Sequence, residues 1–181
     1  MKKAEKSEKT EKKYERVTQE FAPVCSADSR VLILGTAPSR KSREVGFYYG
    51  HPQNRFWKLM AAILEEAVPQ TTEEKKAMLL RNGIALHDVI HSCDIIGSSD
   101  SSIRNVEPAD LERILDVTGR IPVLCNGGTS YKLYKKYQEK KLGIEALQMP
   151  STSPANAAWT LERLKEEWSK ALLPCLVERG K

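Results

Sequence analysis

The sequence predicts an α/β fold in three layers, with a central parallel four-stranded sheet between two layers of helices. Short continuous apolar runs, typical of strands buried on both faces, alternate along the chain with longer segments of helical periodicity. Such alternation is expected of a parallel sheet covered by helices on both faces. The length of 181 residues, with 40% hydrophobic and 29% charged residues, is ordinary for one globular domain with its own core.

The first 16 residues are rich in lysine and glutamate and contain almost no apolar side chain. Such a segment cannot bury enough surface to offset the entropy of ordering it. We therefore expect residues 1–20 to form a disordered charged tail and residues 21–181 to form a single domain. Two interpretations of the tail remain open: a basic arm that follows DNA, and a solvated leader. The near balance of lysines and glutamates favours the leader.

The expected elements follow from hydrophobic pattern and from proline and glycine signals. Strands are expected at residues 31–34, 84–89, 123–125 and 144–149. Helices are expected at residues 54–67, 72–81, 108–117, from 128 to about 140, and 157–177, with Thr71 or Thr72 capping the second of them. Residues 97–105 are interpreted as a polar loop. Ligands of parallel sheets bind beyond the carboxyl ends of the strands, which nominates the loops that begin at Gly35, Asn126 and Pro150.

Composition limits the classes of function. The net charge of +5 favours a polyanionic partner such as nucleic acid, without identifying it. No apolar run approaches the roughly 20 residues that span a bilayer, and residues 1–20 lack the apolar core of a signal peptide. We expect a cytoplasmic protein that does not contact a membrane.

The cysteines and histidines do not form a recognisable metal site. The four cysteines are far apart and include no Cys-x-x-Cys pair, so we expect isolated reduced thiols. His87 and His91 lie near Asp88 and Cys93, but no second cluster completes a four-ligand site. We therefore expect neither a metal nor another cofactor.

Three segments carry residues suited to chemistry. The segment GTAPS at 35–39 follows a buried strand, where Gly35 permits a sharp turn that exposes backbone amides. The segment GFYYGHPQNRFW at 46–57 concentrates aromatic side chains, a histidine and an amide, which suit stacking on a flat ring. The third segment is MPSTSPAN at 149–156, after the fourth expected strand.

These segments resemble the two motifs of the uracil-DNA glycosylase superfamily, particularly the mismatch-specific uracil/thymine glycosylases and the hypoxanthine-DNA glycosylases beside them. Ala37 stands where the mismatch-specific enzymes have a water-positioning asparagine, and Met149 stands where the main uracil-specific family has a histidine. The Tyr-Tyr-x-His-Pro-x-Asn segment that ends at Asn54 and the PSTSPA segment at 150–155 match the hypoxanthine branch. So does the segment DSSIRN at 100–105.

The resemblance implies roles for individual residues. Asn54 would be catalytic, positioning the attacking water by accepting a hydrogen bond from it. Base-binding residues would be Thr36, Ala37, Tyr49 and Asn126. DNA-binding residues would be Ser39, Arg43, Ser151, Thr152, Ser153, Pro154 and Ala155. Two alternatives stay open. Asn126 is equally well explained as a helix cap. His51 is either a general acid or a structural residue, and we favour the structural role.

The implied function is that of a monofunctional DNA glycosylase, since no motif contains a lysine placed as a Schiff-base nucleophile. The expected partner is double-stranded DNA that contains a deaminated base, hypoxanthine foremost, with single-stranded DNA left open and a monomer expected. One alternative is a mismatch-specific uracil/thymine glycosylase. An alternative of another class is a non-catalytic nucleic-acid-binding module on the same fold, against which the presence of Tyr49 and Asn54 argues.

Overall fold

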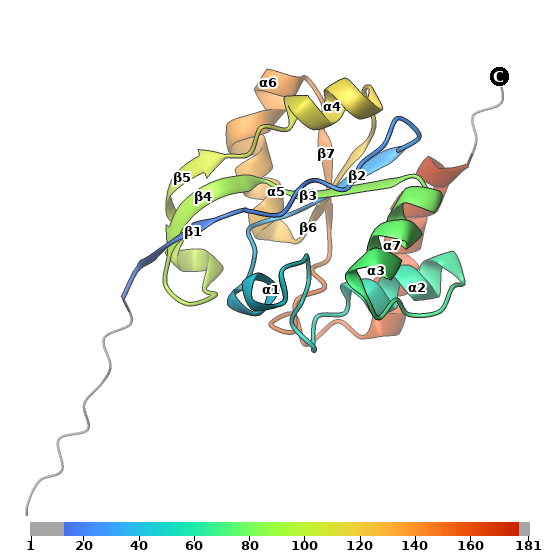
Figure 1. Cartoon of the computed structure of the whole chain (residues 1–181), viewed down its shortest axis with the longest axis horizontal. Helices are drawn as coiled ribbons and strands as arrows, with labels where there is room; N and C mark the ends of the chain where they lie inside the picture. Colours follow the sequence, from blue (N-terminus) through green and yellow to red (C-terminus); the bar gives the residue numbers. More distant parts are fainter. Residues whose placement is uncertain (1–12, 178–181) are drawn as a thin grey trace, which may run out of the picture.

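The computed structural model describes residues 13–177, in which two sheets are packed against helices (Figure 1). The strands are β1 (Glu15–Thr18), β2 (Val31–Gly35), β3 (Ile84–Asp88), β4 (Ile90–Ile95), β5 (Arg104–Pro108), β6 (Val123–Asn126) and β7 (Ala146–Met149). The helices are α1 (Arg40–Val45), α2 (Phe56–Leu64), α3 (Thr72–Arg81), η1 (Asp100–Ser102), α4 (Glu112–Thr118), α5 (Gly128–Tyr134), η2 (Lys135–Glu139), α6 (Lys140–Leu142) and α7 (Leu161–Leu176).

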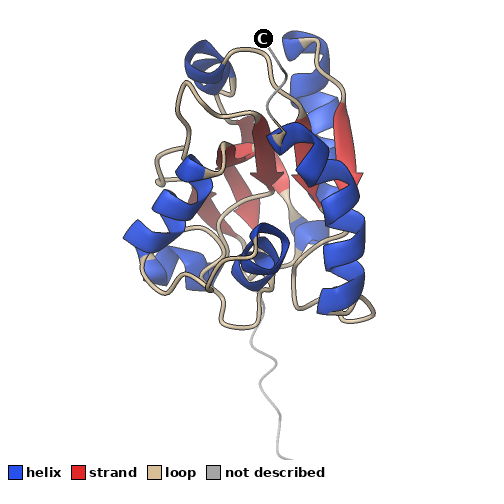
Figure 2. Ribbon diagram, turned by 90° about the vertical axis from the view of Figure 1, so that its right-hand side faces the viewer, coloured by secondary structure: helices blue, strands red, loops and turns tan. Residues whose placement is uncertain are grey.

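The central sheet has four parallel strands in the order β3-β2-β6-β7, which confirms the predicted sheet. Successive residues of β2 face opposite layers. Ile33 belongs to the core cluster that includes residues of α2 and α7, whereas Leu32 and Leu34 belong to the cluster that includes residues of α4 and α5. Figure 2 shows the strands between these two groups of helices. Burial on both faces explains why the strand is a continuous apolar run.

A second sheet was not predicted from the sequence. Strands β1, β4 and β5 form an antiparallel sheet in which β4 lies between the other two. The predicted loop at 97–105 is therefore wrong at its end, where β5 begins at Arg104, and Pro108 ends a strand instead of starting a helix. Four of the five residues of β5 are exposed, so the strand carries no apolar signature. Proline is tolerated there because β5 is at the edge of its sheet.

The predicted disordered tail is also wrong over its last residues. Strand β1 pairs with β4 from Glu15 to Thr18, and the backbone N–H of Gln19 donates to the carbonyl of His91. Residues 1–12 of the expected tail lie outside the described residues. The segment from 15 to 19 thus belongs to the folded structure, and Gln19 reaches the candidate site described below.

The helices agree with the prediction in position more than in number or extent. Helix α3 has the predicted bounds, whereas α2 begins at Phe56 and α7 begins at Leu161, after Thr160 as its N-cap. The short helix α1 was not predicted. None of the described helices is both long and apolar enough to cross a membrane.

Helix α3 gives a test of the local folding rules. The Thr71 hydroxyl accepts a hydrogen bond from the Glu74 backbone N–H at 3.1 Å and so caps the helix. We expect Thr71→Ala to lower the free energy of unfolding by about 1 kcal/mol. Thr72→Ala, one residue later and without a capping hydrogen bond, is the matched control. Equal losses in urea denaturation would show that the cap does not stabilise α3.

Candidate active site

A cavity of about 370 Å³ opens at the carboxyl ends of the parallel strands. The loops after β2 and β7 line it, as predicted, together with Asn126 at the end of β6 and Asp88 at the end of β3. Its volume falls within the roughly 300–1,000 Å³ typical of small-ligand sites. The cavity is therefore large enough for one base.

Tyr49 provides the flat surface of this cavity. One face of its ring stacks on Phe56, with the ring centroids 4.1 Å apart and an interplanar angle of 25°. Its backbone lies in the left-handed region, with φ of 52°, which is unusual for a side chain of this size. The phenol oxygen accepts a hydrogen bond from Asn126 Nδ2 at 3.1 Å. Since Phe56 covers one face, the other face of Tyr49 is the one available to a ligand.

A buried hydrogen-bond network joins the loops. The Thr152 hydroxyl accepts from Asn126 Nδ2 at 3.0 Å and donates to Asn54 Oδ1 at 2.9 Å. The Thr152 backbone N–H donates to Asn126 Oδ1 at 3.1 Å. Thr152 was expected to bind DNA, and that role stays a prediction, although its side chain is 0% exposed. It fixes the positions of Asn54 and Asn126 relative to each other.

Asn126 lines the cavity at the end of β6, where its Nδ2 donates to Tyr49 and Thr152 and its Oδ1 accepts from the Thr152 backbone N–H. The alternative that it caps a helix is wrong, because Gly127 is the N-cap of α5 and no side chain caps that end. Its expected role in binding a base stays a prediction. Its observed contacts hold the Tyr49 ring and the loop that contains Thr152.

Asn54 lines the cavity, and its amide oxygen, unlike its amide nitrogen, is occupied by hydrogen bonds from described residues. Its Oδ1 accepts from the Phe56 backbone N–H at 2.9 Å as well as from Thr152. Both acceptor positions of the oxygen are thus used, and no described residue accepts from Nδ2. The expectation that Asn54 positions water by accepting a hydrogen bond does not fit this arrangement, whereas donation from Nδ2 does.

The loop after β2 places Thr36, Ala37 and Ser39 along the cavity. Among the described residues, none accepts a hydrogen bond from the backbone N–H of Thr36 or Ala37. These two N–H groups are free to bind a ligand, and their expected role in orienting a base stays a prediction. Ser39 caps α1, since its hydroxyl accepts from the Ser42 backbone N–H at 3.1 Å.

Arg43 does not line the cavity, and its guanidinium pairs with Glu15 of β1 at 3.1 Å. The predicted phosphate contact of Arg43 would have to compete with this ion pair. It remains a prediction.

Arg55 organises the loop after β7, a role not anticipated from the sequence. Its guanidinium donates to the carbonyls of Ser153 at 2.9 Å, Asn156 at 3.1 Å and Trp159. Its backbone N–H donates to the carbonyl of Thr152 at 3.1 Å. These bonds hold the loop while the remaining predicted DNA-binding residues keep some exposure, namely Ser151, Ser153, Pro154 and Ala155.

Asp88 is the residue of the site that sequence reasoning missed. It ends β3, lines the cavity and is only 4% exposed. Burial raises the pKa of its carboxyl to about 7, against a hydrogen bond from Gln19 that lowers it. Its register partner in the sheet is Gly35. Because ligands bind at the carboxyl ends of parallel strands, Asp88 could have been predicted as a site residue from its place at the end of β3.

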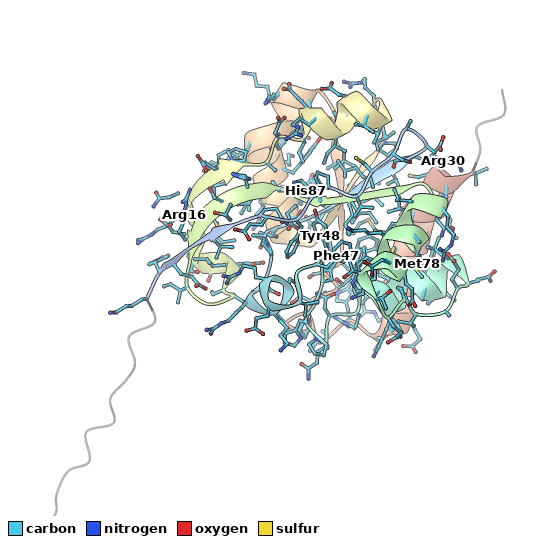
Figure 3. The ribbon with its side chains drawn as sticks, in the orientation of Figure 1. Arg16, Arg30, Phe47, Tyr48, Met78 and His87 are labelled. Atoms are coloured by element: carbon cyan, nitrogen blue, oxygen red, sulfur yellow. The ribbon has the colours of Figure 1, made fainter. Side chains whose placement is uncertain are left out.

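The two histidines nearest the cavity have separate roles. His51 lines the cavity, and its Nδ1 accepts from the Gln53 backbone N–H at 3.1 Å. His87 is buried 2.7 Å from the hydroxyl of Tyr48, and Figure 3 shows the two residues near one another at the centre of the molecule. Burial, with a smaller effect from His91, lowers the pKa of His87 to about 4. Among residues 13–177, no three His, Cys, Asp or Glu side chains cluster as metal ligands.

Comparisons with known proteins agree with this geometry. A family model described as the uracil DNA glycosylase superfamily matches residues 22–173. A protein of Methanosarcina acetivorans named hypoxanthine DNA glycosylase is 32% identical over 149 residues, covering 82% of this chain and 93% of that protein. One of the same name from Methanosarcina barkeri is 29% identical over 154 residues, covering 84% and 96%.

A solved structure has a similar fold. The solution NMR structure of a protein from Methanosarcina acetivorans, named provisionally as a uracil DNA glycosylase, matches with a TM-score of 0.74 at 29% identity. The match covers 87% of this chain and 98% of that chain.

Proposed function

Because the chain belongs to the uracil DNA glycosylase superfamily, we propose that it is a monofunctional DNA glycosylase that excises deaminated bases, hypoxanthine foremost. The substrate is double-stranded DNA, and the protein acts as a monomer. Both curated relatives described above are named hypoxanthine DNA glycosylase, which supports this choice of base. The observation that carries the proposal is the cavity at the strand ends, which is bounded by Tyr49, Asn54 and Asp88.

The size and position of the cavity support base flipping. A base inside a duplex cannot reach this cavity, so the nucleotide must rotate out of the helix. Tyr49 then stacks on the flipped base with the ring face that Phe56 leaves free. The exposed tip of the loop after β7, at Pro154 and Ala155, enters the minor groove beside the vacated space.

The chemistry requires charge stabilisation at two places. Cleavage of the N-glycosidic bond leaves positive charge on the sugar and negative charge on the departing base. Asn54 Nδ2 donates a hydrogen bond toward the base or toward the water that attacks the sugar, and the network through Thr152 holds it in place. The backbone N–H groups of Thr36 and Ala37 bind the base oxygens. Water completes the reaction and leaves an abasic site.

An excision assay on a panel of duplexes tests this function. Duplexes that carry one hypoxanthine, uracil, xanthine or thymine are incubated with excess protein, and abasic sites are detected by alkaline strand cleavage. We expect hypoxanthine to be excised fastest, without covalent trapping of the protein by borohydride. Faster excision of uracil or mismatched thymine would identify a mismatch-specific enzyme. If no base is excised, the remaining hypothesis is a non-catalytic nucleic-acid-binding module.

Binding to DNA depends on salt in a predictable way. If about four lysines or arginines contact phosphates, affinity falls by on the order of a hundredfold between about 50 and 200 mM salt. We expect this slope for the wild type and equally for Asn54→Ala, because Asn54 is not a phosphate contact. Fluorescence anisotropy with a labelled duplex measures both. An affinity that stays flat over this range would contradict DNA binding, with or without catalysis.

A further inference from the structure

Asp88 lines the cavity beside residue 35, where only glycine leaves room for its carboxyl. A Cβ atom added to Gly35 would lie 2.5 Å from Asp88 Oδ1 and 2.9 Å from the Tyr49 hydroxyl oxygen. The carboxyl oxygen and the phenol oxygen therefore converge on the same small space above Gly35. A base stacked on Tyr49 points its inward edge toward this space.

The two oxygens of the Asp88 carboxyl have different surroundings. Gln19 Nε2 donates a hydrogen bond to Oδ2, in a contact that is itself buried. No described residue donates to or accepts from Oδ1. In the neutral carboxyl the proton therefore resides on Oδ1, because Oδ2 is held as an acceptor by Gln19. The proton is then on the oxygen that lies beside Gly35 and Tyr49.

The surroundings of Asp88 favour the neutral carboxyl. The described residues that line the cavity include no lysine or arginine. Of the titratable groups nearest Asp88, Tyr48 and Tyr49 have pKa values raised by burial, with Asp88 adding to that effect, so both stay neutral. His87 precedes Asp88 on β3 and has its pKa lowered to about 4 by burial, so it is also neutral near pH 7.

Two further titratable side chains line the cavity, Asp100 from η1 and His51 from the loop before α2. Burial raises the pKa of Asp100, against a hydrogen bond from Thr129 that lowers it. The described residues that line the cavity, and those of β3, thus include no lysine or arginine that would stabilise the ionised carboxylate of Asp88.

We propose that Asp88 is a catalytic and specificity residue whose neutral carboxyl donates a hydrogen bond from Oδ1 to an acceptor on the inward edge of the flipped base. This inference rests on the proposed function, because it requires a base in the cavity. The donated bond strengthens as the base gains negative charge, so it stabilises the transition state more than the bound substrate.

The reaction balances without another reactant. The electron pair of the bond between C1′ and the ring nitrogen leaves with the base, and a water oxygen bonds to C1′. That water releases one proton and the base takes up one proton, while Asp88 retains its own. The same hydrogen bond gives selectivity, because a deaminated purine carries a carbonyl acceptor where adenine carries an amino donor. An ionised Asp88 would favour adenine instead.

Three proteins test this proposal in single-turnover excision of hypoxanthine from a duplex between about pH 5.5 and 9. The wild-type rate falls about tenfold per pH unit above the pKa of Asp88, near 7. Asp88→Asn keeps a donor and a group that accepts from Gln19, so its rate stays within about tenfold of the wild-type plateau and does not fall over this range. Asp88→Ala is slower by on the order of a hundredfold, the scale of one lost donor.

A second variant moves the pH dependence without touching the carboxyl. The hydrogen bond from Gln19 lowers the pKa of Asp88, so Gln19→Met raises that pKa and shifts the decline in rate to higher pH. A purely structural role of Gln19 would lower the rate equally at every pH.

Folding stability provides a readout independent of activity. A carboxyl whose pKa is raised in the folded protein binds a proton that the unfolded chain releases, between the unfolded pKa of about 3.9 and the folded pKa. The free energy of unfolding of the wild type therefore falls relative to that of Asp88→Asn as pH rises from about 4 to 7. If the difference between the two proteins does not change with pH, Asp88 is not neutral in the folded state and the proposal is wrong.

The outcomes that overturn the proposal differ from those that overturn the proposed function. A wild-type rate that rises with pH, together with an Asp88→Asn variant as slow as Asp88→Ala, would make Asp88 an ionised base. Equal rates for all three proteins would make it a bystander. In both cases hypoxanthine is still excised, whereas a wild type that excises no base contradicts the proposed function itself.

Discussion

We expect Asn54→Ala to excise hypoxanthine on the order of a hundredfold more slowly than the wild type in single-turnover assays, with little change in affinity for DNA. The reason is that Asn54 lines the cavity with no described residue accepting from its Nδ2, while its oxygen is held by the Phe56 backbone N–H and the Thr152 hydroxyl. Loss of a positioned donor costs about this much in an enzyme site. DNA affinity is retained because it rests on phosphate contacts.

The same substitution also removes the hydrogen bond to Phe56 at the start of α2, so a structural effect has to be separated. We expect Asn54→Ala to lose about 1 kcal/mol of stability for this reason. Asn54→Asp is the matched variant, since it keeps an oxygen for Phe56 and Thr152 but has no amide N–H. It should melt like the wild type and excise as slowly as Asn54→Ala. An Asn54→Asp protein with the wild-type rate would show that the residue only supports the helix.

Gly35→Ala is expected to reduce excision by a hundredfold or more, because the added methyl group would occupy the space beside Asp88 and Tyr49 in the cavity. Its Cβ would lie 2.5 Å from Asp88 Oδ1 and 2.9 Å from the Tyr49 hydroxyl oxygen, both under the 3.0 Å that real Cβ contacts respect. Asp88 is buried and Tyr49 is stacked on Phe56, so neither can move without disturbing the site. A displacement of about 1 Å at a reacting centre costs on this scale.

Gly128→Ala is the control for this glycine. A Cβ there would meet only the end of the flexible Gln148 side chain, at 3.3 Å. We expect it to retain excision within a few-fold of the wild type by the same assay, with both variants checked by thermal melting. A Gly35→Ala protein that is folded and as active as Gly128→Ala would show that the space above Gly35 is not part of the site.

The parallel sheet was predictable because its central strands, β2 and β6, are buried on both faces and are largely apolar in sequence. Strand β5 was not, because it is an exposed edge strand with the sequence Arg-Asn-Val-Glu-Pro. Strand β1 was missed for a similar reason, since three of its four residues are exposed and it follows a lysine- and glutamate-rich segment. Both strands depend on pairing with β4, which a local pattern does not reveal.

The candidate site was predictable where a loop follows a buried strand. Thr36 and Ala37 of the loop after β2 line the cavity, and so do Tyr49 and Asn54, whose expected roles came from the family resemblance. The buried role of Thr152 was not predictable, because its partners are 26 and 98 residues away along the chain.

Asp88 was missed because, beside His87 and His91, it was considered only as a metal ligand, and that site was rejected. Its actual partner is Gln19, from a segment expected to be disordered. The end of β3 is the strand end that the sequence analysis did not nominate, although β3 is parallel to β2.

The most direct test of the central claim is the identity of the product released from a duplex that carries a single deoxyinosine. After incubation with excess wild-type protein, the small molecules and the DNA are separated and analysed by mass spectrometry. We expect free hypoxanthine and an uncleaved strand with one abasic site in equal amounts, and much less of both with Asn54→Asp. Intact deoxyinosine DNA with the wild type, or a cleaved strand in place of the abasic site, would contradict a monofunctional glycosylase.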